Sequence, residues 1–73
     1  MKISFIGHRR TDGSRYKVIM VNGIAKGAIN KIEKTEHRLR HWEGYIYVGK
    51  DKWAICETTL DDVIGRVREA YRS

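Results

Sequence analysis

Residues 16–32 read YKVIMVNGIAKGAINKI, two strand-like runs on either side of an Asn-Gly dipeptide. Asn-Gly between such runs favours a type I′ hairpin turn, because both central residues need a positive φ. A two-residue turn at this place sets the cross-strand register. The expected pairs are Val21 with Ile24, Met20 with Ala25, Val18 with Gly27 and Tyr16 with Ile29. The segment therefore predicts a β-hairpin on which the rest of the chain is organised.

The hairpin register predicts one apolar face with a shallow depression in it. Four side chains are expected on that face: Tyr16, Val18, Met20 and Ile29. Ala25 and Gly27 leave the depression, and we expect the C-terminal helix to fill it. Gly65, inside that helix, is consistent with close backbone approach to the sheet, although an exposed glycine without such a role remains an alternative.

A second hairpin is predicted from the runs GYIYV at 44–48 and WAICE at 53–57, with a turn at 49–52 between them. The expected pairs are Val48 with Trp53 and Ile46 with Ile55. These four residues share one face, and the other face carries Tyr45, Tyr47, Ala54 and Cys56. Both faces are apolar, so the pattern leaves open which of them meets the core.

The segments outside the two hairpins predict a strand at the start of the chain, a connection between the hairpins and a helix at the end of the chain. Residues 2–6 (KISFI) indicate a short edge strand, and residues 7–15 a mobile basic loop. Between the hairpins we expect a turn near 34–37 and a strand that enters with Leu39, with a short helix as the alternative. The C-terminal helix is expected over about 59–72.

The C-terminal helix has both a start signal and an apolar stripe. A threonine N-cap at 58–59 precedes Asp61 and Asp62, which suit the positive end of the helix dipole. Apolar residues then recur on one side: Leu60, Val63, Ile64, Val67 and Tyr71. Residues 1–73 therefore predict a single α+β domain, an antiparallel sheet of four to five strands in meander order with one helix packed on a face.

The positive charge is concentrated in the first two thirds of the chain. The formal net charge is +6; residues 1–52 hold twelve Lys or Arg against five acids, and residues 53–73 hold three against four. A basic surface speeds association with polyanions or acidic protein faces, or it keeps a small domain soluble. The single cysteine, Cys56, excludes an internal disulfide, and no apolar run is long enough to span a membrane, so we expect a cytoplasmic protein.

No arrangement of side chains in the sequence indicates catalysis or a cofactor. His37 and His41 are four residues apart and could in principle bind zinc together with His8 and Cys56. A structural zinc site usually has closely paired ligands at both ends, whereas His8 and Cys56 each stand alone, so we predict no metal. Asp61 and Asp62 lie next to each other at a helix start, where they point in different directions. We therefore expect a protein that is not an enzyme.

Arginines interleaved with aromatic residues are the remaining functional signal. They are Arg9, Arg10, Arg15, Arg38, Arg40, His41, Trp42, Tyr45 and Tyr47. Nucleic-acid-binding proteins use cations for phosphates and aromatic rings for bases. Protein interfaces are enriched in the same residue types. From the residues alone, a nucleic-acid partner and a protein partner stay equally open.

The opening residues 2–10 (KISFIGHRR) and the closing residues 59–64 (TLDDVI) resemble those of small phage-encoded transcription regulators that bind host bacterial RNA polymerase. The likeness extends over the chain but includes no diagnostic motif. It implies binding to the polymerase β and β′ subunits, inhibition of σ-dependent initiation and antitermination. We also expect a monomer in the host cytoplasm that touches no membrane. A small basic nucleic-acid-binding module is the alternative.

An open N-terminal edge strand and the arginine loop are the surfaces on which we expect a partner to dock. The residues predicted to contact the partner are Ile3, Phe5, Ile6, Arg9, Arg10, Arg38, Arg40 and Trp42. For Ile3, Phe5 and Ile6 the alternative is core packing, and for the arginines it is simple solvation.

Overall fold

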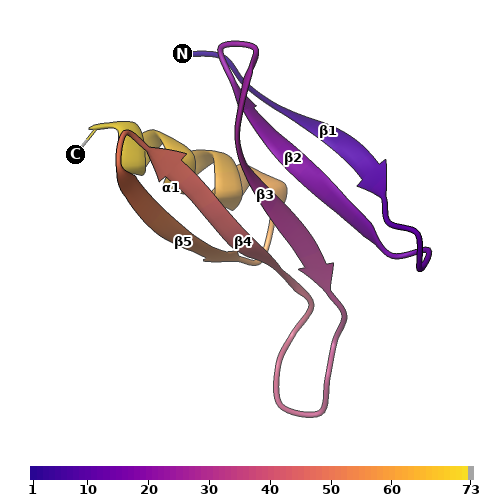
Figure 1. Cartoon of the computed structure of the whole chain (residues 1–73). Coiled ribbons are helices and arrows are strands. Elements are labelled where there is room, and N and C mark those ends of the chain that lie inside the picture. Colours follow the sequence, from indigo (N-terminus) through magenta and orange to yellow (C-terminus); the bar gives the residue numbers. More distant parts are fainter. Residues whose placement is uncertain (73) are drawn as a thin grey trace.

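The computed structural model describes residues 1–72, which form five strands and one helix. In chain order the elements are β1 (Ile3–Arg9), β2 (Arg15–Val21), β3 (Ile24–Ile32), β4 (His41–Val48), β5 (Asp51–Glu57) and α1 (Leu60–Arg72). The strands pair antiparallel in the order β1-β2-β3-β4-β5, so β1 and β5 are the edges. Figure 1 shows α1 on one face of the sheet, over β4 and β5. The predicted α+β meander is confirmed.

The β2–β3 hairpin turns at Asn22-Gly23, as predicted. Asn22 has φ 52° and Gly23 has φ 80°, the two positive values that a type I′ turn requires. The first pairs, Val21 with Ile24 and Met20 with Ala25, match the expected register.

Beyond Ala25 the predicted register is wrong, because β3 carries one extra residue. Ile19 pairs with Gly27, so Lys26 has no partner of its own and forms a β-bulge. A one-residue shift moves every later side chain of a strand to the other face. Ile29 therefore lies on the face of Ile19, and the predicted group with Tyr16, Val18 and Met20, with its depression, does not form.

The core lies between α1 and the face of the sheet that carries Ile19 and Ile29. Its buried residues are Ile19, Val21, Ile29, Ile46, Ile55, Val63, Val67 and Ala70. Six of them are fully buried isoleucines and valines, and burying an aliphatic side chain of this size stabilises a fold by about 1.5–3 kcal/mol. Ile46, Val48, Trp53 and Ile55 share this face, as predicted, which settles the question that the sequence pattern left open.

The β4–β5 hairpin is tighter than predicted. Val48 pairs with Asp51 and Ile46 with Trp53, so the turn contains only Gly49 and Lys50. Gly49 has φ 61°, which suits the first central position of a type II′ turn. The register differs by two residues from the expected one, and an even shift keeps each side chain on its predicted face.

Two predicted loop boundaries also change. β1 extends to Arg9 and β2 begins at Arg15, so the connection is residues 10–14 rather than 7–15. β4 begins at His41, and Leu39, predicted to enter the strand, lies in the preceding loop with 72% of its surface exposed. Leu39 lies outside the strand pairing, which starts with Ile32 and His41.

The helix begins as its sequence predicts. Thr59 Oγ1 accepts a hydrogen bond from Asp62 N–H at 3.1 Å, the contact of an N-cap. Val63 and Val67 are buried, and Leu60 and Tyr71 pack beside them. No helix within residues 1–72 has the length and apolar character needed to cross a bilayer. Gly65 faces solvent with no atom near its Cβ position, so the predicted close approach to Ala25 and Gly27 does not occur.

Glycines 44 and 65 make a matched pair for testing this packing. A Cβ on Gly44 would run into the carbonyl oxygen of Ala28 and lie 2.7 Å from Ile29 Cα. We expect Gly44→Ala to lower the free energy of unfolding by about 1–3 kcal/mol or more, as overpacking does. Gly65→Ala should raise it by about 0.8–1 kcal/mol, the gain in helix propensity. Urea denaturation followed by circular dichroism measures both, and equal effects of the two substitutions would contradict the packing described.

Candidate functional site

A hollow of about 470 Å³ lies at the end of the sheet where β1 ends and β2 begins. Residues from four strands line it: Gly7, His8, Arg9, Arg15, Tyr16, Lys17, Lys31 and Trp42. Four of these are lysine or arginine, and none is acidic. The hollow is therefore a basic site at one corner of the molecule.

Strand register explains why these cations converge. Arg9 pairs with Arg15 across β1 and β2, and Gly7 pairs with Lys17. Alternate residues of a strand share a face, so all four lie on the side that α1 covers further along. Gly7 has no side chain, and no other atom lies within 4 Å of where its Cβ would be. The missing side chain opposite Lys17 opens the floor of the hollow.

The cations of the hollow are not neutralised by the protein. Ion pairs among residues 1–72 involve other side chains, and none includes Arg9, Arg15, Lys17 or Lys31. Like charges directly opposite each other on a sheet are destabilising. An arrangement of four such groups without an acid favours an anionic ligand that brings the missing negative charge.

Trp42 gives the hollow an aromatic wall. It pairs with Lys31 across β3 and β4, and it also packs against the core. Lys17 Nζ lies 5.9 Å from the centre of its ring, within cation–π range. Because the core fixes the indole, its accessible surface is presented to a ligand at little entropic cost.

A second aromatic group lies behind the hollow, on the face of the sheet opposite α1, because His8 and Tyr16 alternate with the residues of the hollow along β1 and β2. The rings of His8 and Tyr16 stack with their centres 5.3 Å apart. Arg10 Cζ lies 4.5 Å from the centre of the Tyr16 ring, and its Nη2 donates to Asn30 Oδ1 at 2.6 Å. The guanidinium is thus held over the Tyr16 ring on that opposite face, apart from the four cations of the hollow.

The turn at residues 10–14 sets the spacing of Arg9 and Arg15. Arg10 N–H donates to the Ser14 carbonyl at 2.8 Å and Gly13 N–H to the Arg10 carbonyl at 3.0 Å. Asp12 Oδ1 accepts from Ser14 Oγ at 2.7 Å and from Ser14 N–H at 2.9 Å. These two hydrogen bonds, the hydroxyl one above all, lower the pKa of the Asp12 carboxyl, and the Arg10 charge adds to the effect.

The eight residues predicted to contact a partner do not form one surface. Arg9 and Trp42 meet in the hollow. Ile3 and Phe5 are half-buried and pack against the core on the helix side, so they are not free to make the first contact. Ile6 is on the opposite face and 46% exposed.

The three other arginines of that set lie elsewhere. Arg10 lies over Tyr16, as described above. Arg38 is directed at Glu43 and Cys56, at the β4–β5 end of the open face. Arg40 is exposed in the loop before β4.

Lys17 and Lys31 are the functional candidates that sequence reasoning missed. Each sits in a strand with apolar neighbours, where a lone lysine looks like an ordinary exposed position. The signal that unites them with Arg9 and Arg15 is their common face. Recognising it requires the β3 register, which the bulge at Lys26 shifts.

Comparison of the chain with protein-family models, with curated proteins and with solved structures finds no match.

The Asp12 contacts predict a pH-dependent turn. A carboxyl whose pKa is lowered by folding stabilises the fold above its usual pKa, and that contribution is lost as the pH falls through the lowered value. In an NMR titration, the Ser14 amide signal should therefore move at a pH below the usual Asp range. Ser14→Ala removes the hydroxyl donor and should raise the Asp12 midpoint. An unchanged midpoint in this variant would contradict the hydrogen-bond assignment.

Proposed function

We propose that the protein is a binding module without catalytic activity that holds single-stranded nucleic acid in its basic hollow. One observation carries the proposal: four cations without ion-pair partners surround a tryptophan that the core holds in place. Phosphates supply the missing negative charge, and a base supplies a flat partner for the indole. Few other classes of ligand carry both negative charges and flat aromatic rings along one polymer.

The geometry favours a single strand over a duplex. The aromatic wall lies inside a concave site, which an unstacked base can enter and a base within a duplex cannot. The stacked Tyr16 and His8 rings offer a second place for a base on the other face of the sheet. Arg10 lies beside these rings as the four cations lie beside Trp42, so each face of the sheet offers positive charge next to an aromatic ring.

A second candidate is the docking to host bacterial RNA polymerase that the sequence resemblance implies. The observation in its favour is that β1 is an edge strand with no partner on its outer side within residues 1–72. Such an edge can add a strand from another protein. In this reading the protein is a monomer in the host cytoplasm that binds the β and β′ subunits, inhibits σ-dependent initiation and promotes antitermination. The basic hollow next to β1 would then meet the emerging RNA.

Binding of a labelled single-stranded RNA or DNA of about ten nucleotides tests the first proposal. Fluorescence anisotropy should show affinity that falls with salt at a slope of about −2.8, since four phosphates at about 0.7 each release counterions. Replacing Lys17 and Lys31 with glutamine should reduce the slope to about −1.4. A salt-independent affinity, or no binding at low salt, would overturn the proposal.

Two variants distinguish binding in the hollow from attraction by the overall positive charge of the protein. Lys50→Gln with Arg68→Gln removes the same charge from the far turn and the outer side of α1, and it should leave the slope unchanged. Gly7→Leu adds no charge but fills the floor of the hollow, where no atom opposes it, and should weaken binding. If Lys50→Gln with Arg68→Gln lowers the salt slope as much as the replacement of Lys17 and Lys31 does, the hollow is not the binding site.

Capture from a bacterial lysate tests the polymerase candidate. After nuclease treatment, the immobilised protein should retain the β and β′ subunits, identified by mass spectrometry. Arg9→Glu with Arg10→Glu should reduce the yield, because both arginines lie next to the β1 edge. Arg68→Glu with Arg72→Glu is the matched control on α1. Failure to retain the two subunits removes this candidate and leaves the nucleic-acid proposal standing.

A further inference from the structure

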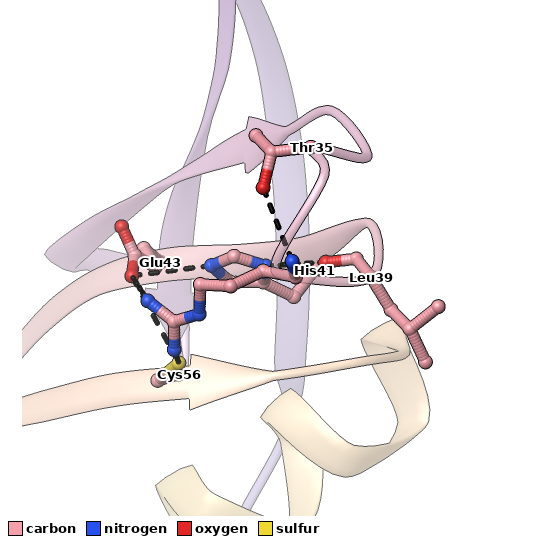
Figure 2. Close-up of polar contacts among 6 residues, drawn as sticks. Thr35, Leu39, His41, Glu43 and Cys56 are labelled. Carbon is pink, nitrogen blue, oxygen red and sulfur yellow. Dashed lines mark hydrogen bonds and ion pairs between the residues drawn. The ribbon is translucent and has the colours of Figure 1, made fainter.

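A compact group of possible metal ligands lies on the face of the sheet opposite α1. Glu43 and Cys56 are cross-strand partners on β4 and β5, and His41 precedes Glu43 by two residues, so all three share that face. One donor atom from each lies within 4.8 Å of the other two. Figure 2 shows the His41 ring, the Glu43 carboxylate and the Cys56 thiol directed toward one another.

His41 points to a missing positive charge in this group. Its Nδ1 lies 2.8 Å from the Leu39 carbonyl oxygen, which can only accept, so Nδ1 carries the proton. In a neutral ring, Nε2 then has a lone pair and no hydrogen. Nε2 lies 3.1 Å from Glu43 Oε1, which is also an acceptor.

This nitrogen is buried without a hydrogen bond. His41 is 7% exposed, and its Nε2 is the one buried side-chain nitrogen or oxygen of residues 1–72 that lacks a hydrogen-bond partner. It lies close to Glu43 Oε1, but no hydrogen bond joins the two atoms. Two acceptors face to face need a cation between them.

The Arg38 guanidinium is a cation that already lies against Glu43 and Cys56, but its contacts with them are weak. Its Nη1 lies 3.4 Å from Glu43 Oε1 and its Nη2 3.7 Å from Cys56 Sγ, both long for charge-assisted contacts. The Arg38 side chain is 60% exposed. It can therefore swing into solvent and leave Glu43 and Cys56 to another cation.

We propose that His41 Nε2, Glu43 and Cys56 Sγ bind a zinc ion, with water as the fourth ligand. Imidazole, thiolate and carboxylate are the ligand types that zinc takes in proteins. On binding, the thiol gives its proton to solvent and the thiolate forms the bond to the metal. Arg38 leaves at the same time, since its charge would oppose the ion.

The distances require only side-chain rotations. Tetrahedral zinc places such donor atoms roughly 3.3–3.6 Å apart. Nε2 and Glu43 Oε1 are 3.1 Å apart, and Cys56 Sγ is 4.0 Å from the same oxygen. Cys56 is exposed, so its side chain is free to close the difference.

The surroundings of His41 are those of a metal ligand. A coordinating histidine usually donates its second ring N–H to a carbonyl or carboxylate, which fixes the ring. The Leu39 carbonyl has this place. The same loop is closed by Thr35, whose Oγ1 accepts from Arg38 N–H at 3.1 Å. Bound metal would consequently hold the segment 33–40 against the sheet.

The structure also shows why residue spacing along the chain does not indicate this site. Of the four residues considered for zinc, His8 stacks on Tyr16 and His37 is exposed beside Glu36. Only His41 and Cys56 meet. The third ligand, Glu43, joins them through strand pairing, which spacing along the chain does not reveal.

Cobalt titration of the reduced, metal-free full-length protein tests the site. Co²⁺ should give a near-ultraviolet absorption band from thiolate charge transfer, which Zn²⁺ then abolishes by displacement. Cys56→Ser should lose the band, and because Cys56 is exposed this variant should stay folded. His8→Ala and His37→Ala are matched histidine controls and should keep it.

Affinity and stability give a second readout. By competition, Glu43→Gln should bind Zn²⁺ about 10–100-fold more weakly, whereas Arg38→Ala should bind at least as tightly as the parent protein. Zn²⁺ should raise the melting temperature of the parent and not of Cys56→Ser. A band that persists in Cys56→Ser, or the absence of a band in excess Co²⁺, would overturn the proposal. The positive charge between His41 and Glu43 would then be a proton on His41 Nε2 and not a metal ion. The test uses no nucleic acid or polymerase, so its result is independent of the proposed function.

Discussion

The extra residue in β3 is the constraint on which the arrangement of this molecule depends. With Lys26 bulged out, Ile29 turns to the side of Ile19, and a continuous apolar face forms for α1 to cover. Without the bulge, the residues of β3 beyond it would exchange faces, and Ile29 would lie in solvent. The same shift places Lys31 on the helix side, next to Trp42, where it completes the basic hollow. Core and candidate site therefore share one local cause.

Much of the fold follows from local sequence rules, because local chemistry fixes it. Asn22-Gly23 allows only a narrow set of turn conformations, and Thr59 and the apolar stripe after it specify where a helix starts and which side it buries. The register beyond Ala25 does not follow, since no residue near Lys26 requires a bulge by its own backbone preference. A bulge is chosen there by the packing of distant strands. The faces of β2 and β3 were consequently assigned wrongly, while those of β4 and β5 were right.

The candidate sites show the same limit. Arg9 and Trp42 were recognised by residue type, but the hollow that unites them with Lys17 and Lys31 is a product of pairing across four strands. Ile3 and Phe5 were taken for docking residues because an N-terminal strand was expected at the edge. It is at the edge, yet its inward side chains pack beneath it. An edge strand offers its backbone to a partner more readily than its apolar side chains.

The two faces of the sheet are thus differently used. One holds the core and, past the helix, the four cations of the hollow, which have no ion-pair partner within residues 1–72. The other holds His41, Glu43 and Cys56. The meander order of the strands also affects how the chain folds. Every strand pairs with its neighbour in sequence, so assembly needs only short loops to close, and such chains fold quickly. The helix rests on β4 and β5, the two strands that precede it directly in the chain, so these contacts are also between neighbours in sequence.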